Sequence, residues 1–264
     1  MAQRIELNKK EIIDKIMLKK EFSDLPRKDV ELVYSQFDKK DLLVEEKIKK
    51  TRDLLRKMYT AFVSGRLLTI KDKDSAWFLK KHISTKERMG FYEDVYKKCL
   101  IGMKKGCTII DFGCGINGFS YEYFNKIGFD AKYLGIEPVG QLVDLQNNYF
   151  KKNKIFDANC VKASLFDLEK VKKIISETKS SRIAFFFKIL DSLEMLKRDY
   201  SKKVLLELMP FFERGVVSWA TKSLVSKKKF HVERKWLKDF LQKEFFIINE
   251  FDFGVEHYVL FSKK

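Results

Sequence analysis

Cysteine, histidine and proline are scarce in this sequence. Its 264 residues include four cysteines, three histidines and three prolines, and no two cysteines form a C-x-x-C pair. Zinc sites need clusters of cysteine and histidine at short spacings, and disulfide frameworks need paired cysteines. We therefore expect no metal site, and we expect reduced thiols at Cys99, Cys107, Cys114 and Cys160.

Long apolar runs are also missing. The N-terminal stretch, residues 1–22, carries charges throughout. No apolar run in the sequence approaches the roughly 20 residues that a membrane-spanning helix needs. The sequence therefore predicts neither a signal peptide nor a transmembrane helix, and we expect a cytoplasmic protein with no membrane partner.

Positive charge, by contrast, is abundant. Lysine and arginine number 54 against 37 acidic residues, which gives a formal net charge of +17. Such an excess favours a polyanionic partner, most often nucleic acid, and predicts binding that weakens with salt. A lysine-rich solvated surface without any nucleic-acid partner is the alternative.

The apolar pattern changes after about residue 105. Before that point apolar residues recur at helical spacing, as at Ile12, Ile13 and Ile16. From Cys107 onward, short apolar runs alternate with amphipathic helical stretches, which is typical of strand–helix–strand units and a parallel sheet. We expect a helical N-terminal domain over residues 1–104 and an α/β domain over residues 105–264.

The α/β part contains seven apolar runs that read as strands: CTIIDF, AKYLGIE, NCVKAS, RIAFFFK, GVVSWAT, FFIINEF and EHYVLFS. The last two are joined only by DFGV, which is too short for a crossover helix, so they must form an antiparallel hairpin. The sequence thus predicts a seven-stranded sheet with five helix-linked strands and an antiparallel C-terminal pair. By analogy of fold alone, this arrangement is typical of class I methyltransferases.

A glycine-rich loop follows the first of these runs. The stretch TIIDFGCGINGFS, residues 108–120, contains G-x-G-x-x-G at Gly113, Gly115 and Gly118, a loop shared by dinucleotide enzymes and S-adenosylmethionine enzymes. Asp111 would repel a pyrophosphate but attract the ammonium and sulfonium groups of S-adenosyl-L-methionine. We therefore expect S-adenosyl-L-methionine as the cofactor, and a dinucleotide-dependent dehydrogenase is the alternative.

Two further strand ends carry candidate cofactor residues. Glu137, followed by Pro138, ends the second run about twenty residues after the loop, where an acid can accept hydrogen bonds from both ribose hydroxyls. Ser164 and Leu165 lie at the end of the third run, where a hydroxyl and an apolar side chain can contact adenine. An ordinary turn residue is the alternative for each.

A capping-box pattern precedes the first strand. Ser84 and Glu87 have the S/T-x-x-E spacing, which predicts a helix that starts at Thr85. Arg88 would then lie in the first turns, where a positive side chain requires an anionic partner. The carboxylate of the cofactor could supply that partner through a bidentate contact, and a salt bridge to Glu87 or Asp94 is the alternative.

These segments resemble a known family, the aminoglycoside-resistance type of small-subunit (16S) ribosomal RNA guanine-N7 methyltransferases. The likeness rests on H-x-S-T-x-E-R at residues 82–88 and D-F-G-C-G-x-N at residues 111–117. Matches to the fourth and fifth strands of the family add Lys188, Leu190, Ser218, Lys222 and Ser223. The resemblance covers residues 75–264, and the earlier residues match the family only in their helical spacing of apolar residues.

The resemblance implies a class I, Rossmann-like methyltransferase fold that uses S-adenosyl-L-methionine. It implies that His82 and Arg88 bind the carboxylate of the cofactor and that Glu137 binds its ribose. The loop residues that would hold the methionine and ribose are Asp111, Gly113, Gly115 and Asn117. The helical N-terminal third would dock onto ribosomal RNA of the small subunit, and we expect a monomer.

The sequence departs from the family pattern at three positions. Gly118 stands where the family usually has proline, and Glu137 with Pro138 replaces an Asp-rich segment. Asp191 replaces a proline after Lys-x-Leu. This last change borders the expected target pocket, so it bears on the target base more than on the cofactor.

The expected chemistry needs no general base. Guanine N7 has an in-plane lone pair and no proton, so we expect no catalytic triad and a rate that comes from positioning and desolvation. Lys188, at the carboxyl end of the fourth strand, would contact the cofactor and anchor a phosphate or O6 of the base. Asp191 would stabilise the purine as it becomes cationic. A solvated surface lysine is the alternative for Lys188.

An RNA substrate would also need an aromatic side chain that stacks on the target base and a basic surface that binds its phosphates. Extrusion of the base onto an aromatic side chain makes Trp219, Phe119 and Tyr121 candidates. Basic clusters at residues 151–154, 170–173 and 222–235 could follow the phosphates. Two other functions remain open: a methyltransferase that acts on tRNA or a small metabolite, and a non-catalytic RNA-binding assembly protein.

Overall fold

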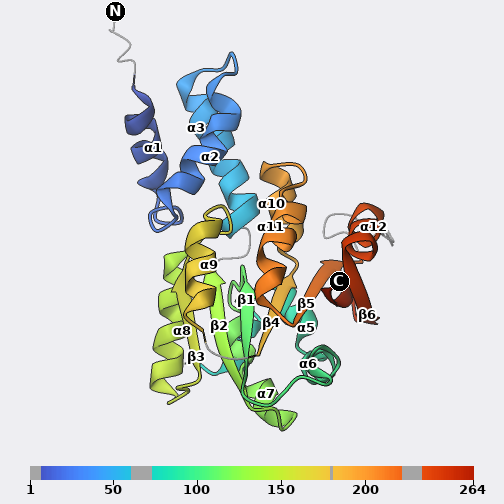
Figure 1. Cartoon of the computed structure of the whole chain (residues 1–264). Coiled ribbons are helices and arrows are strands. Elements are labelled where there is room, and N and C mark those ends of the chain that lie inside the picture. The colour runs from blue at the N-terminus through green and yellow to red at the C-terminus, as the bar shows by residue number, and fades with distance from the viewer. Residues whose placement is uncertain (1–6, 61–72, 179–180, 222–233) are drawn as a thin grey trace, which may run out of the picture.

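The computed structural model of the chain describes residues 7–60, 73–178, 181–221 and 234–264. Its described N-terminal residues are helical, and the rest of the chain folds around one seven-stranded sheet (Figure 1). The strands are β1 (Cys107–Phe112), β2 (Ala131–Glu137), β3 (Ala158–Lys162), β4 (Arg182–Phe187), β5 (Arg214–Ala220), β6 (Phe245–Phe253) and β7 (Glu256–Lys263).

The order of the strands across the sheet is β3-β2-β1-β4-β5-β7-β6. The first five strands are parallel, and β7 runs antiparallel to both of its neighbours, β5 and β6. The predicted seven-stranded sheet with an antiparallel C-terminal hairpin is therefore confirmed. β1 and β2 have the predicted bounds, whereas β3 ends at Lys162 and leaves Ser164 in the following loop.

The sheet is buried on both faces because its central strands are apolar at every position but a few. Side chains alternate between two apolar clusters. Ile109 and Phe185 point into the first cluster, and Ile110 and Phe186 point into the second. Near-continuous apolar strands require a sheet that is covered on both faces, and helices on both sides supply the cover.

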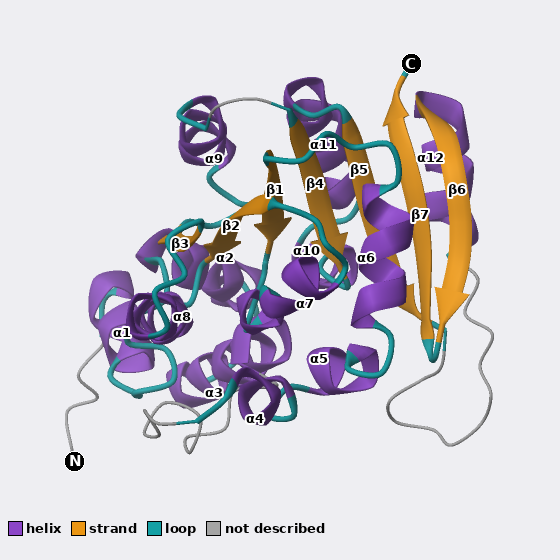
Figure 2. Ribbon diagram, turned by 90° about the horizontal axis from the view of Figure 1, so that it is seen from below, coloured by secondary structure: helices purple, strands orange, loops and turns teal. Residues whose placement is uncertain are grey.

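The helices of the sheet-bearing part are α7 (Glu122–Lys126), α8 (Gly140–Lys152), α9 (Leu168–Ser176), α10 (Leu190–Leu196), α11 (Tyr200–Leu208) and α12 (Lys235–Glu244), with the short turns η2 (Asn117–Ser120) and η3 (Met209–Phe211). In Figure 2, α7 and α8 lie on one side of the sheet and α9 and α11 on the other. The apolar side chains of α8 join the first cluster, and those of α9 and α11 join the second.

The N-terminal part consists of α1 (Lys9–Met17), α2 (Arg27–Asp38), α3 (Val44–Leu55), η1 (Arg56–Thr60), α4 (Ser75–Leu79), α5 (Ile83–Arg88) and α6 (Tyr92–Leu100). Helices α1 to α3 gather at one end of the molecule (Figure 1). Ile16, Val33 and Leu55 belong to the same apolar cluster as Ile109 and Phe185 of the sheet. One core thus runs across the predicted boundary at residue 104, and the division into two domains stays a prediction.

Three sequence expectations concern absences. Within the described ranges, no helix is long and apolar enough to cross a membrane. The same residues contain no group of three or more metal-ligating His, Cys, Asp or Glu side chains. All four cysteines are buried as free thiols.

Candidate functional site

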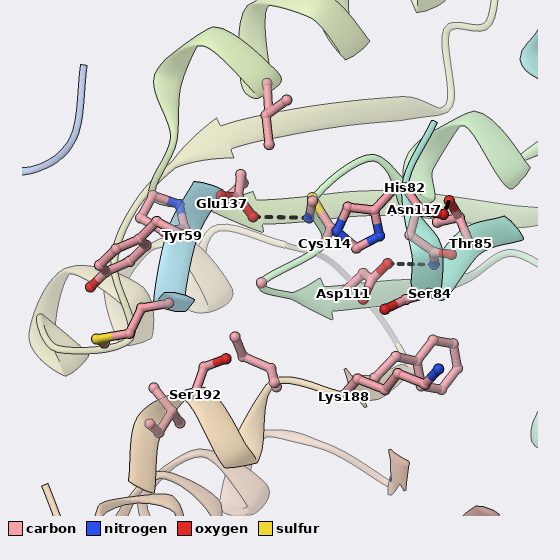
Figure 3. Close-up of a pocket in the computed structure, with 18 of the residues that line it drawn as sticks. Tyr59, His82, Ser84, Thr85, Asp111, Cys114, Asn117, Glu137, Lys188 and Ser192 are labelled. Carbon is pink, nitrogen blue, oxygen red and sulfur yellow. Dashed lines mark hydrogen bonds between the residues drawn. The ribbon is translucent and has the colours of Figure 1, made fainter. Parts of the chain in front are cut away.

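A pocket of about 890 Å³, counted with the solvent at its mouth, opens at the carboxyl ends of β1, β2 and β4. This is the edge where open α/β sheets hold ligands. Its lining includes Tyr59 of η1, residues of α5 and the glycine loop (Figure 3). In Figure 3, Tyr59 and Glu137 lie toward one end, and Thr85 and Lys188 lie toward the other.

Backbone geometry explains two of the glycines in the loop. Gly113 and Gly115 have φ angles of +61° and +54°, in the left-handed region that residues other than glycine rarely adopt. At Gly113 an added Cβ would also lie 2.6 Å from Cδ1 of Ile189. The loop therefore needs glycine at Gly113 for two reasons, its backbone angle and its contact with the segment after β4.

Gly118 is held by a hydrogen bond that proline could not make. Its backbone N–H donates to Oε1 of Gln146 on α8 at 2.9 Å, and an added Cβ would lie 2.4 Å from the same oxygen. Gln146 is fully buried. The departure from the family pattern at Gly118 is thus matched by a partner side chain in this chain.

Asp111 lies behind the glycine loop with a buried carboxylate. Its Oδ2 accepts hydrogen bonds from Nδ2 of Asn117 and from the hydroxyl of Tyr133, both at 2.8 Å. Burial raises the pKa of Asp111 to about 6, against the effects of its hydrogen bonds and of Arg88. The structure therefore places the acid in the pocket lining and fixes it there with two donors.

Glu137 ends β2 and is held by the backbone. Its Oε2 accepts from the N–H of Gly115 at 2.9 Å, and its Oε1 accepts from the N–H of Val139 at 3.1 Å. Burial raises the pKa of Glu137 to about 7, although these two bonds lower it. The carboxylate thus lies at the pocket wall in a fixed orientation.

The helix that carries Arg88 differs from the prediction. It begins at Ile83 with His82 as its N-cap and no side-chain cap, and the single proton of the Thr85 hydroxyl faces the carbonyls of Leu79 and His82. The capping box of Ser84 and Glu87 is therefore wrong. Arg88 lies in the last turn, where the helix dipole favours a cation.

Arg88 is buried and already surrounded by acceptors. Its Nη2 lies 2.7 Å from Oε1 of Glu256, its Nη1 donates to Oδ1 of Asn117 at 3.0 Å, and its Nε donates to the hydroxyl of Tyr258 at 3.0 Å. The predicted alternative, a salt bridge to Glu87 or Asp94, is wrong, because the partner comes from β7. Three of the five N–H groups of the guanidinium are used in this way.

Lys188 follows β4 with a φ of +56°, which is unusual for a residue with a side chain. Its Nζ lies 2.7 Å from Oε2 of Glu87 and 3.4 Å from Oε2 of Glu256. The interpretation as a solvated surface lysine does not fit these contacts, since only 13% of the side chain is exposed. Lys188 lines the pocket at the same end as Arg88.

His82 lies in the lining, close to the glycine loop. Burial, together with the charges of Arg88 and Lys188, lowers the pKa of His82 to about 4. The imidazole is therefore neutral near pH 7, so it can offer a hydrogen bond but no charge to a bound carboxylate.

The structure brings most of the predicted residues together in one lining: His82, Arg88, Asp111, Gly113, Gly115, Asn117, Glu137, Pro138 and Lys188. Their roles in binding stay predictions. Ser164 and Leu165 are not in this lining, and Ser164 instead donates to Asp29 of α2 at 2.5 Å. Asp191 is also outside it, because its carboxylate pairs with Arg234 at 2.6 Å.

The candidate aromatic platforms are core residues. Trp219, Phe119 and Tyr121 are all buried, and none lines the pocket. Phe119 stacks on Phe78, and the Tyr121 hydroxyl donates to the carbonyl of Ala131. The prediction of a stacking role is therefore wrong for these three residues. Lys222, Ser223 and most of the cluster at 222–235 lie outside the described residues.

Sequence reasoning missed the partners that come from distant segments. Glu256 and Tyr258 hold Arg88, and Met58, Tyr59 and Phe166 line the pocket near Glu137. The sequence contains one signal for Glu256, an acid at the start of an otherwise apolar strand. Met58 and Tyr59 lie in a helical stretch whose pattern does not distinguish them from core residues.

Comparisons with known proteins agree with this architecture. No protein-family model matches the sequence. The solved structure of the 16S rRNA methylase RmtF, in complex with S-adenosyl-L-homocysteine, matches with a TM-score of 0.79 at 17% identity, over 98% of this chain and 100% of that chain. The chain shares its fold with the 16S rRNA methylases. The predicted class I methyltransferase fold is therefore confirmed.

Other relatives point the same way. The structure of the 16S rRNA methylase RmtB matches with a TM-score of 0.75 at 19% identity, over 97% of this chain and 99% of that one. A 16S rRNA (guanine(1405)-N(7))-methyltransferase of Proteus mirabilis is 22% identical over 189 residues, 70% of this chain and 64% of that protein. The aligned stretch thus spans less than two thirds of the length of this curated relative. The resemblance stated from the sequence is confirmed.

Proposed function

We propose that this chain is an S-adenosyl-L-methionine-dependent methyltransferase that modifies guanine N7 in the 16S ribosomal RNA of the small subunit. The observation that carries the proposal is the pocket at the carboxyl edge of the sheet, with Asp111 and Glu137 behind a glycine loop and Arg88 at one end. The activities named for the Proteus mirabilis relative and for the RmtB and RmtF structures support it.

The hydrogen bonds of the glycine loop favour this cofactor over a dinucleotide. A pyrophosphate needs free backbone N–H groups from such a loop. Here the N–H groups of Gly113 and Cys114 donate to the carbonyl of Ile136, and that of Gly115 donates to Glu137. That of Gly118 donates to Gln146. A diphosphate would therefore meet two buried acids and few donors, whereas a sulfonium and an ammonium group suit the acids.

The two ends of the pocket suit the two halves of the cofactor. Near Glu137 the lining is largely apolar, with Tyr59, Pro138, Leu142 and Phe166, which suits an adenine ring. Glu137 can accept from the ribose hydroxyls there. At the other end, Arg88 keeps two N–H groups beyond its three described bonds, and neutral His82 lies nearby, so both can donate to the methionine carboxylate.

The reaction requires little from the protein beyond positioning the methyl group and the guanine N7. When bound, S-adenosyl-L-methionine supplies an electrophilic methyl group, which N7 of guanine takes by in-line displacement without losing a proton. Lys188, fixed between Glu87 and Glu256, forms the wall beside the methionine end and is available to the O6 atom or a phosphate of the target. Phe187 and Ile189 line the same wall and exclude water from it.

The net charge of +17 supports an RNA substrate. Of the basic clusters, residues 151–154 are exposed at the end of α8 and just after it, and Lys170 and Lys173 are exposed on α9. Lys172, between them, pairs with Glu169 and Glu207. We propose that these clusters and the helices of the N-terminal part follow the phosphates of the subunit, with the chain acting as a monomer in the cytoplasm, where ribosomes are found. Asp191, paired with Arg234, would then act at the rim rather than on the purine.

The test is methyl transfer to separated RNA. The protein is incubated with methyl-labelled S-adenosyl-L-methionine and with intact small subunits, free 16S rRNA or total tRNA, and N7-methylguanine is mapped by chemical cleavage. We expect label in intact small subunits at a guanine N7. Label in tRNA alone would contradict the proposal. Binding of the cofactor without any transfer would favour an RNA-binding assembly protein, and tight binding of NADH would favour a dehydrogenase.

A further inference from the structure

The helical N-terminal part contributes directly to the pocket. Met58 and Tyr59 of η1 are lining residues, and all the other lining residues lie between His82 and Leu193. Tyr59 lies toward the Glu137 end of the pocket, the end that suits adenosine (Figure 3). It occurs in a π-helical turn, a rare conformation that is common at functional sites.

A buried acid of another helix holds the hydroxyl of Tyr59. Oδ2 of Asp29, on α2, accepts from the Tyr59 hydroxyl at 2.8 Å and from the Ser164 hydroxyl at 2.5 Å. Asp29 is 2% exposed. One carboxylate oxygen thus joins three segments that are distant in sequence: α2, η1 and the loop after β3.

A buried carboxylate is energetically unfavourable if its only role is to connect these three segments. A buried carboxylate that accepts bonds from hydroxyls alone costs more to desolvate than a neutral acceptor would. Within the described residues, Asp29 forms no ion pair that would offset this cost, and burial raises its pKa. The hydrogen bond from the Tyr59 hydroxyl to Oδ2 does, however, fix the direction of the Tyr59 side chain, and the Ser164 hydroxyl holds the same oxygen in place.

We propose that Asp29 is a positioning residue that holds the ring of Tyr59 against the adenosine half of the cofactor. The helical N-terminal part then completes the cofactor pocket, in addition to any contact that it makes with RNA. This inference rests on the proposed function, because it takes S-adenosyl-L-methionine as the ligand. Asp29 touches no ligand itself and acts through the Tyr59 hydroxyl.

A double-mutant cycle separates positioning from simple fastening. The variants are Asp29→Ala, Tyr59→Phe and the double variant in the whole 264-residue chain. The ligands are adenosine, which fills only one half of the pocket, and S-adenosyl-L-homocysteine, which fills both. Affinities are measured by calorimetry, and folding is checked by circular dichroism. Asp24→Ala is the matched control, because Asp24 pairs with Lys162 across the same boundary but does not line the pocket.

We expect each single change to weaken the binding of both ligands about tenfold, the effect of losing a hydrogen bond to a charged group. The double variant should lose no more than either single one, because both changes break the same contact. In transfer assays the KM for the cofactor should rise by the same factor, while kcat stays within about twofold. The control should bind like the original chain.

Other results would overturn the inference. Unchanged adenosine affinity in Tyr59→Phe would do so, and so would losses that multiply in the double variant. If Asp29→Ala does not fold, Tyr59→Phe decides alone. If the unaltered chain binds neither S-adenosyl-L-homocysteine nor adenosine, the proposed function itself fails, which distinguishes that outcome from a failure of the inference.

Discussion

Nη2 of Arg88 and Oε1 of Glu256 form a buried ion pair at 2.7 Å, although 168 residues separate them in the sequence. Oε2 of the same carboxylate lies 3.4 Å from Nζ of Lys188, and the Ser218 hydroxyl donates to its Oε1 at 2.5 Å. One acid on β7 therefore contacts both cations of the predicted site, and Lys188 has Glu87 as a second partner.

The first prediction is that Glu256→Gln destabilises the fold. Removing one partner of a buried ion pair leaves the other charge uncompensated, which costs about 3–5 kcal/mol. The free energy of unfolding in urea should fall by that amount. Glu250→Gln is the matched control, because the Glu250 pair with Lys238 is near the surface and should contribute less than about 1 kcal/mol. Equal losses in the two variants would contradict the prediction.

The difference in free energy of unfolding between Glu256→Gln and the original chain should also depend on pH. Burial alone would raise the pKa of Glu256, but Arg88 and Lys188 outweigh it and hold the pKa below its ordinary value of 4.5. A depressed acidic pKa stabilises the fold above 4.5, and this contribution is lost as the pH falls through the folded-state pKa. Urea titrations at pH 7 and below 4 should therefore show a large difference that shrinks in acid.

The second prediction concerns the pH dependence of cofactor binding. The pKa of Glu137 is about 7, and an ionised carboxylate accepts from ribose hydroxyls better than a protonated one. The affinity for S-adenosyl-L-homocysteine should therefore fall about tenfold as the pH is lowered from about 8 to 6. Asp111, whose pKa is about 6, should add a further loss in more acidic solution.

Calorimetry across this range provides the check. In Glu137→Gln the affinity should be lower at pH 8, and the part of the pH dependence between 8 and 6 should disappear. A variant that kept the full pH dependence would assign it to another group.

The third prediction compares two glycines with the same backbone conformation. Gly113 and Gly128 have φ angles of +61° and +67°, but an added Cβ meets Ile189 at Gly113 and nothing within 4 Å at Gly128. Gly128→Ala should lower the free energy of unfolding by about 1–2 kcal/mol, the cost of the left-handed conformation. Gly113→Ala should lose about 1–3 kcal/mol more from overpacking.

Gly113→Ala should also weaken cofactor binding, whereas Gly128→Ala should not, because Gly128 is outside the pocket lining. Adding Ile189→Ala to Gly113→Ala should recover part of the lost stability. If the two single glycine variants were equally stable, the contact with Ile189 would not matter.

The fourth prediction is that the residue usual in the family is unfavourable here. Gly118→Pro removes the N–H that donates to Gln146 and brings ring atoms toward an oxygen that lies 2.4 Å from the Cβ position. We expect a loss of about 2 kcal/mol or more in thermal or urea unfolding. Adding Gln146→Ala should reduce this loss, since it removes both the unpaired acceptor and the overlap. A stabilising effect of Gly118→Pro alone would contradict the prediction.

The sheet could be predicted from the sequence because its signals are local. β1 and β2 are largely apolar runs with an acid next to the end of β1 and at the end of β2, and DFGV allows only a hairpin between the last two strands. The glycine loop and Glu137 could be placed for the same reason, since residues at the carboxyl ends of neighbouring parallel strands meet at one edge.

The partners of the site residues could not be predicted, because they depend on tertiary contacts. Nothing near Arg88 indicates Glu256, and nothing near Ser164 indicates Asp29, which is 135 residues away. The capping-box error has a similar cause. The Glu87 carboxylate accepts from Lys188, 101 residues away, and the helix starts at Ile83 rather than at the predicted Thr85. The local sequence pattern therefore predicts where a side chain lies but not which distant residue it contacts.

The place of β7 in the sheet has a consequence for how the protein forms on the ribosome. β7 follows β6 in the chain but inserts between β5 and β6, so the edge of the parallel sheet stays open until this segment has been synthesised. Until then Arg88 lacks its counter-ion, and the nascent chain carries an unneutralised cation inside an otherwise assembled core. The pocket, with Arg88 neutralised in its lining, is therefore complete only after β7 has paired with β5.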